Sequence, residues 1–147
     1  MTITLLKGNT VTTEDQKQIT LLYRQLNAQI KQLSVKKVLE RDERSAFVVC
    51  RIENVIVGMA VMAIYTVISG KKGMIEDVVV DEKYRGNGIG KKIMQVLLSE
   101  AKNRNVTELL LFTGHHRKPA IKLYEGLGFT LKQSGLYTLK TDTLSNR

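Results

Sequence analysis

The chain has 147 residues, of which 43% are hydrophobic and 25% charged, so it is long enough to bury one hydrophobic core and ordinary for a globular protein. The net charge of +9 suggests an anionic ligand, but the basic residues are scattered and aromatic residues make up only 5%, so we expect no nucleic-acid partner. No apolar run reaches membrane-spanning length, no secretory signal pattern begins the chain, and the single Cys50 excludes an internal disulfide. We therefore expect one cytoplasmic domain over residues 1–147, without a membrane partner.

The first half of the chain predicts four strands and two helices. Alternating or β-branched apolar residues predict strands at 2–6, 47–52, 55–68 and 75–80. Apolar residues at helical spacing predict one helix from Thr12 or Thr13 to about Gln29, and a second from a Ser34 cap to Arg41. Turns at 53–54 and 70–73 join the last three strands as hairpins.

The second half predicts two helices and three strands. A helix from Gly90 to about Asn103 and a strand at 108–113 form a right-handed crossover with the strand at 75–80. Pro119 suits the first turn of a helix that ends at Gly128. A final hairpin follows, with strands at 129–132 and 136–139, and we expect residues 141–147 to fray. The predicted order is β-α-α-β-β-β-α-β-α-β-β, an α/β fold with a mixed sheet.

A glycine-rich turn stands between the strand at 75–80 and the next helix, with the sequence Arg85-Gly86-Asn87-Gly88-Ile89-Gly90. Glycines leave backbone amides accessible, and the first amides of a helix attract anions, so the turn predicts a pyrophosphate site. A Walker-type loop is excluded because Arg85 and Lys92 occupy its glycine and hydroxyl positions. A dinucleotide-binding turn is excluded because Lys91 stands where it requires a third glycine.

Two motifs resemble those of one family. The pattern Arg85-x-x-Gly88-x-Gly90 resembles the acetyl-CoA signature of the Gcn5-related N-acetyltransferase (GNAT) superfamily. Residues 120–129, AIKLYEGLGF, resemble the family's A-x-x-x-Y-x-x-x-G-F segment, and the predicted element order matches its fold along nearly the whole chain. One departure is Arg117, which stands where many members carry Asn and could serve phosphate instead.

The resemblance implies an enzyme that transfers the acetyl group of acetyl-CoA to a primary amine by direct attack, without a metal. It implies that the strand backbone pairs with the pantetheine arm, through Val78, Val79 and Val80. It implies that amides of the turn hold the pyrophosphate, from Arg85 through Gly86, Asn87, Gly88, Ile89 and Gly90 to Lys91. Tyr124 would then protonate the departing thiolate; alternatively, Tyr124 only packs.

The general base is expected among the carboxylates that precede the turn. Glu76 is the first choice and Asp77 the second, because Glu76 shares strand parity with Val78 and Val80 and should lie on their face of the sheet. An ion-paired Glu76 or a water relay remain alternatives. His115 and His116 lack further ligands at metal-binding spacing and are expected to be loop residues.

The acceptor is the least constrained part of the prediction. Small-molecule amines and peptide amines, including amino sugars, protein N-termini and lysines, all remain open. The two N-terminal helices, the loop between them at residues 27–34 and the last hairpin are expected to bind the acceptor. A non-catalytic acyl-CoA-binding regulator on the same fold is the alternative function. Members of the family often dimerise, so the resemblance leaves a homodimer open.

Overall fold

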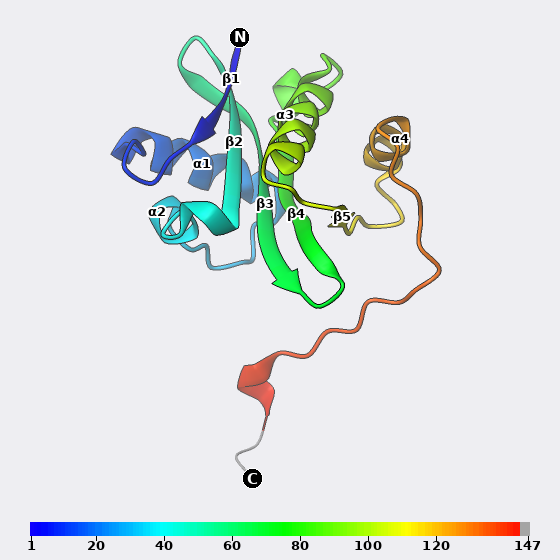
Figure 1. Ribbon diagram of the computed structural model, residues 1–147. Helices are drawn as coiled ribbons and strands as arrows, with labels where there is room; N and C mark the ends of the chain where they lie inside the picture. Colours follow the sequence, from blue (N-terminus) through cyan, green and yellow to red (C-terminus); the bar gives the residue numbers. More distant parts are fainter. Residues whose placement is uncertain (145–147) are drawn as a thin grey trace.

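The computed structural model describes residues 1–144 and has a five-stranded mixed sheet at its centre (Figure 1). The sheet order follows the sequence, with β1 Thr2–Leu6, β2 Ser45–Ile52, β3 Val55–Val67, β4 Gly70–Val80 and β5 Glu108–Leu111. The pairs β1–β2, β2–β3 and β3–β4 are antiparallel, and β5 runs parallel to β4. The helices are α1 Thr13–Leu26, α2 Val35–Val38, α3 Ile89–Asn103 and α4 Lys118–Gly126.

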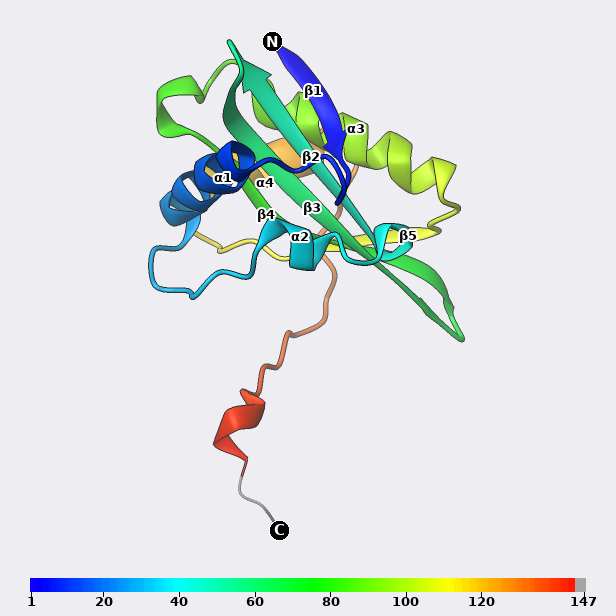
Figure 2. The same ribbon diagram turned by 90° about the vertical axis from the view of Figure 1, so that its left-hand side faces the viewer.

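Helices cover both faces of this sheet (Figure 2). On one face α1 and α2 bury an apolar cluster that includes Ile19, Leu22 and Val79. On the other face α3 packs its apolar stripe, including Ile93 and Leu97, against the strands, and α4 adds the side chain of Tyr124. Residues three to four apart on a helix share one side, which is why α3 can bury this stripe while its lysines remain exposed.

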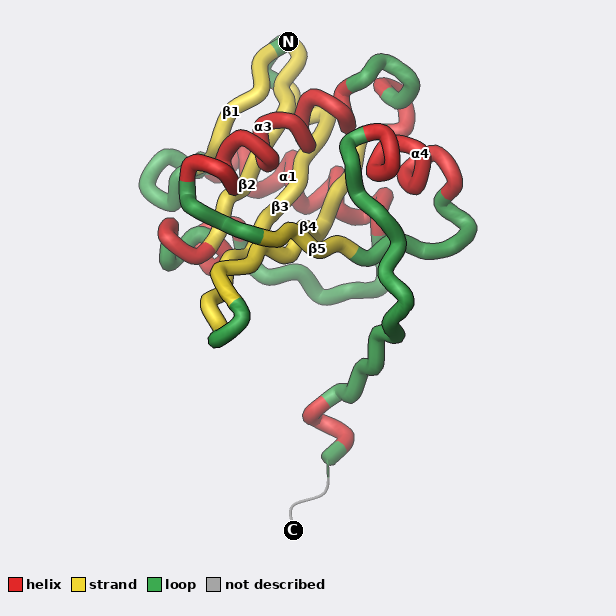
Figure 3. The backbone as a smooth tube through the Cα atoms, turned by 45° about the vertical axis from the view of Figure 1, so that its right-hand side comes forward, coloured by secondary structure: helices red, strands yellow, loops and turns green. Residues whose placement is uncertain are grey.

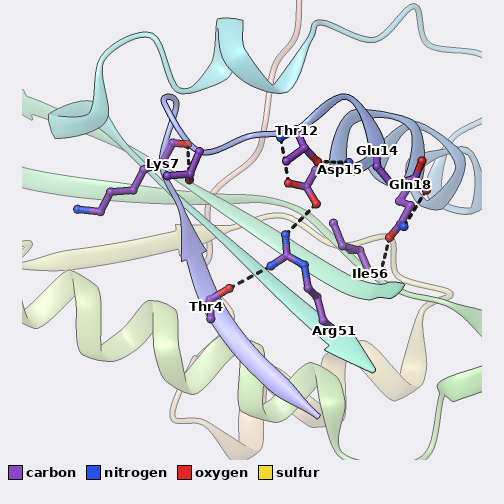
Figure 4. A network of polar contacts seen from close by, with 9 residues as sticks. Thr4, Lys7, Thr12, Glu14, Asp15, Gln18, Arg51 and Ile56 are labelled. Carbon is purple, nitrogen blue, oxygen red and sulfur yellow. Dashed lines mark hydrogen bonds and ion pairs between the residues drawn. The ribbon is translucent and has the colours of Figure 1, made fainter. Parts of the chain in front are cut away.

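Polar contacts fix α1 over the sheet (Figure 4). The Thr12 hydroxyl accepts a hydrogen bond from the N–H of Asp15 at 3.0 Å, and the Asp15 carboxylate accepts one from the N–H of Thr12 at 3.1 Å. The same carboxylate lies 2.9 Å from Nη2 of Arg51 on β2, and the Gln18 side chain accepts from the N–H of Ile56 on β3 at 2.7 Å. The start of α1 is thereby tied to two strands, which sets the position of its later residues.

Several predicted boundaries are confirmed and others are wrong. Thr12 and Ser34 cap their helices, but α1 ends at Leu26 and α2 has only four residues. The strand β4 begins at Gly70, because the turn predicted at 70–73 lies instead at residues 68–69.

The predicted C-terminal hairpin is wrong: within the described residues, 129–144 contain no strand (Figure 3). This segment touches β5 through an ion pair of Lys132 with Glu108 at 3.4 Å and then runs away from the body. Thr141–Thr143 forms a short 3-10 helix, and residues 145–147 of the tail expected to fray lie outside the described residues.

Candidate active site

The parallel pair β4 and β5 separates partway along the sheet. Their register runs from Lys72 opposite Glu108 to Ile75 opposite Leu111, where β5 ends. The following residues of β4, 76–80, pair with β3 only. The β4 backbone therefore offers hydrogen-bonding groups on its other side, which is what pairing with an extended ligand requires.

A β-bulge at Asp77 interrupts β4 at this point. Met59 lies opposite Val79 and Val61 opposite Glu76, so β4 carries one more residue than β3 between these pairs. Asp77 adopts a left-handed backbone with φ 56°, which Asp tolerates better than most residues.

The bulge corrects one prediction about Glu76. Val78 and Val80 pack against the cluster beneath α3, whereas Val79 belongs to the cluster beneath α1. Ile75 also lies on the α3 face, and successive side chains of a strand point to opposite faces. Glu76 therefore belongs to the α1 face with Val79. The expectation that it shares a face with Val78 and Val80 was wrong because the extra residue breaks the alternation.

The turn between β4 and α3 has the form expected of an anion site. Gly86 and Gly88 have φ values of 79° and 74°, and a Cβ added to either would meet no atom within 4 Å. Gly88 caps α3, whose first hydrogen bond runs from the Lys92 N–H to the Gly88 carbonyl at 3.1 Å. The amides before Lys92 lie at the positive end of the helix dipole.

Side chains of the turn stabilise its own backbone. Nε of Arg85 donates to the carbonyl of Val80 at 2.9 Å, and the Asn87 side-chain amide donates to the carbonyl of Tyr84 at 3.0 Å. These bonds hold the turn against the end of β4 without occupying the space in front of the two glycines. The turn is therefore preorganised.

A cavity of about 640 Å³ joins these features, a volume within the range of sites that bind small molecules. Ten of the predicted site residues line it: Glu76, Val78, Val79, Val80, Arg85, Gly86, Ile89, Gly90, Arg117 and Tyr124. Asn87 and Gly88 of the turn and Lys91 in the first turn of α3 do not line the cavity. Arg85 of the turn and Arg117, the N-cap of α4, supply positive charge to the lining, and Glu76 and Asp77 supply negative charge from the bulge.

Tyr124 reaches the cavity from α4, whose first turn contains Pro119 as predicted. The side chain is buried and its ring lies edge-on to that of Phe129, with centroids 6.1 Å apart. Burial raises the pKa of the phenol, although the positive charge of Arg117 opposes this shift. Tyr124 therefore packs in the core and also lines the cavity.

The opposite end of the cavity is acidic. Burial raises the pKa of Asp77. Glu76 is solvent-exposed, and its partial desolvation by the surrounding atoms together with the charge of Asp77 raises its pKa. Tyr23 of α1 also lines this end, where burial and the two carboxylates raise its pKa. The N-terminal helices are expected to contact the acceptor, but helical spacing indicates only a core position for Tyr23; its neighbours Gln25 and Asn27 line the cavity as well.

Other predicted elements lie elsewhere. Of residues 27–34, expected to bind the acceptor, only Asn27 lines this cavity; Ala28 and most of the remainder border a separate hollow. His115 and His116 are exposed and do not line the cavity. Among residues 1–144, no three His, Cys, Asp or Glu side chains are grouped to hold a metal ion, and no helix has the length and apolar character needed to cross a membrane.

A strand edge next to a bulge, followed by a glycine turn and a helix N-terminus, is an arrangement suited to an extended ligand that carries phosphate. The family model described as "Acetyltransferase (GNAT) family" matches residues 12–129. The chain belongs to the GNAT acetyltransferase family.

Individual relatives match over shorter stretches. N-alpha-acetyltransferase 30 of Saccharomyces cerevisiae is 34% identical over 58 residues, which are 40% of this chain and 33% of that protein. Thialysine N-epsilon-acetyltransferase of Mus musculus is 35% identical over 65 residues, 44% of this chain and 38% of the relative. The match thus spans about a third of the length of each relative.

A solved structure extends the likeness to the whole fold. The crystal structure of a predicted acetyltransferase from Clostridium acetobutylicum, solved with acetyl-CoA, superposes with a TM-score of 0.67 at 21% identity and covers 99% of this chain and 100% of that one. The mixed sheet and its helices are therefore those of the GNAT fold.

Proposed function

We propose that this protein is an acetyl-CoA-dependent N-acetyltransferase in which a primary amine attacks the thioester directly. One observation carries the proposal: the unpaired edge of β4 at residues 76–80 and the glycine turn border the same cavity. An extended arm can pair with such an edge, and a pyrophosphate can accept hydrogen bonds from the amides at the start of α3. Coenzyme A has both parts in this order.

The residues present fit this cofactor. The backbone of Val78, Val79 and Val80 would pair with the pantetheine arm, and the open space in front of Gly86 and Gly88 leaves room for phosphate oxygens. Arg117 would add positive charge from the start of α4. Bound acetyl-CoA supplies an acetyl group activated as a thioester. The turn amides that would hold its phosphates belong to Arg85, Gly86, Asn87, Gly88, Ile89, Gly90 and Lys91.

Two side chains would move the protons. Tyr124 keeps its proton because burial raises its pKa, and it would donate that proton to the departing thiolate. Glu76 would accept the proton of the amine, directly or through water, and its raised pKa brings it nearer to neutral pH, where a base is most effective. Asp77 is the second candidate for this role.

The acidic end of the cavity favours a positively charged acceptor. Glu76, Asp77 and Tyr23 surround the place where the amine would approach, while Arg85 and Arg117 belong to the cofactor end. One carboxylate suffices as a base, so the other is free to attract a second cationic group of the acceptor. Diamines and basic peptides fit this arrangement better than phosphorylated amino sugars do.

The first test separates cofactor binding from other functions. Acetyl-CoA added to the protein should raise its melting temperature, because a ligand that binds only the folded state stabilises it. An equimolar adenosine control lacks the pyrophosphate and the arm and should leave the melting temperature unchanged. Equal responses to the two compounds, or none to acetyl-CoA, would refute the cofactor assignment.

The second test separates an enzyme from a non-catalytic acyl-CoA binder. Free-thiol release is measured with a diamine, an N-terminal peptide amine and glucosamine 6-phosphate. We expect release with the cationic amines, at a rate that Glu76→Gln lowers about 100-fold. Glu82→Gln alters an exposed carboxylate that does not line the cavity and serves as the matched control. Acetyl-CoA binding without thiol release for any amine would favour the binder.

A further inference from the structure

A side chain in the last turn of α1 links this helix to the segment that leads into the glycine turn. The Oε1 atom of Gln25 accepts a hydrogen bond from the N–H of Glu82 at 3.0 Å. Glu82 begins the 3-10 helix Glu82–Tyr84, and Arg85, the first residue of the glycine turn, follows it directly. Gln25 also lines the cavity, as does Tyr23 one half-turn earlier on α1. The bond therefore connects the two walls of the cavity that would receive the acceptor and the cofactor.

The 3-10 helix is held together by its own hydrogen bonds. The N–H of Asp81 donates to the carbonyl of Val57 on β3 at 2.8 Å, and the N–H of Tyr84 donates to the carbonyl of Asp81 at 2.8 Å. A segment this short has few backbone dihedrals that could absorb a change at one end. Ordering of the glycine turn is therefore felt at the N–H of Glu82, and through it at Gln25.

The link is exposed, which makes it sensitive to what binds nearby. Water competes for the Gln25–Glu82 hydrogen bond, and exposed bonds of this kind open more readily than buried ones. Gln18, earlier on α1, makes a similar bond to the N–H of Ile56 at 2.7 Å, but that bond is partly buried (Figure 4). The start of α1 is thus held more firmly than its end.

We propose that Gln25 is a positioning residue that couples occupation of the glycine turn to the acceptor end of the cavity, an inference that rests on the function proposed above. A pyrophosphate bound at the turn would fix the backbone there, and with it the N–H of Glu82. The bond to Gln25 would then hold the last turn of α1, and Tyr23 with it, against the cavity. A second ligand pays less for ordering a segment that the first has already ordered, so the amine should bind more tightly once the cofactor is in place.

Three variants isolate this one bond. Gln25→Met keeps a side chain of similar length and helix propensity but offers no oxygen to the N–H of Glu82. Gln25→Glu keeps an acceptor oxygen and should restore the coupling. Gln16→Met is the matched control, because it removes a bond of the same kind from α1, that of Oε1 to the N–H of Val35 on α2 at 2.7 Å, and Gln16 does not line this cavity.

The first test measures amide hydrogen exchange of the full chain with and without coenzyme A. In the natural protein, coenzyme A should slow exchange at least about tenfold both in the turn, residues 82–92, and in the last turn of α1, residues 23–27. In Gln25→Met the turn should remain protected, while the protection of residues 23–27 should fall below about twofold. Gln25→Glu and Gln16→Met should behave like the natural protein.

The second test measures free-thiol release with ethylenediamine at saturating acetyl-CoA. Gln25→Met should raise the KM for the amine about fivefold and leave kcat unchanged, because the bond positions α1 and moves no proton. A lower kcat at constant KM, or protection of residues 23–27 that persists in Gln25→Met, would overturn the inference and leave the proposed function standing. Coenzyme A that protects no part of residues 82–92 in the natural protein would instead refute the cofactor assignment, and the coupling with it.

Discussion

Gly88→Ala isolates the backbone requirement of the glycine turn. An added Cβ would meet no atom within 4 Å, so no steric contact opposes it, but the residue has φ 74°. A residue with a Cβ loses about 1–2 kcal/mol in this left-handed conformation. Gly126→Ala is the matched control, because its Cβ is equally free and its φ lies outside the left-handed range. Gly126→Ala should stabilise the protein by about 0.4–1 kcal/mol because alanine reduces the conformational entropy of the unfolded chain.

Gly88→Ala gains the same unfolded-chain term, so the two variants should differ by the left-handed cost alone, about 1–2 kcal/mol in free energy of unfolding. At about 2–4 °C per kcal/mol for a chain of this size, their melting temperatures should lie ~2–8 °C apart, with Gly88→Ala the lower. Urea unfolding and thermal melts measure both quantities. Addition of acetyl-CoA should then raise the melting temperature of Gly126→Ala as in the natural protein, and that of Gly88→Ala by less. Equal stability of the two variants would refute the argument from backbone conformation.

Three further predictions concern single polar side chains. Tyr124→Phe should lower turnover in the thiol-release assay about 100-fold while the thermal shift with acetyl-CoA stays unchanged; normal turnover would remove its role as proton donor. Asp15→Asn should cost about 1.5 kcal/mol in urea unfolding at pH 7, because the carboxylate binds the Thr12 N–H and the Arg51 guanidinium. Burial would raise the pKa of Asp15, but these two contacts hold it below its usual value. The difference in free energy of unfolding between the natural protein and the variant should therefore shrink as pH falls below about 4 and the carboxylate is protonated. Asp77→Asn should raise the melting temperature at pH 7 and leave it unchanged near pH 3. Burial raises the pKa of Asp77, so ionisation of this carboxylate opposes folding as pH rises. A lower melting temperature of the variant at pH 7 would contradict this.

Local features of the sequence were sufficient to predict most elements and the glycine turn. Helix caps at Thr12 and Ser34 depend on residues three positions away, and the turn depends on glycines within six residues. The final hairpin was mispredicted because a strand requires a partner, and residues 129–144 find none within the described chain. Tyr23 reaches the cavity only because α1 is tied to β2 and β3, contacts that helical spacing cannot reveal.

The bulge at Asp77 explains why the site could be predicted only in part. Alternation along β4 assumes that every residue has one partner, and nothing in the sequence indicates where an extra residue enters. That one residue has two consequences. It bends β4 at the place where β5 ends, so the backbone from Glu76 onward is free on one side. It also places Glu76 on the α1 face of the sheet, whereas Val78 and Val80 lie on the α3 face. The carboxylates and the free strand edge thus meet in one cavity because of a single insertion in the register, which follows from the tertiary pairing of β4 with β3 rather than from any local motif.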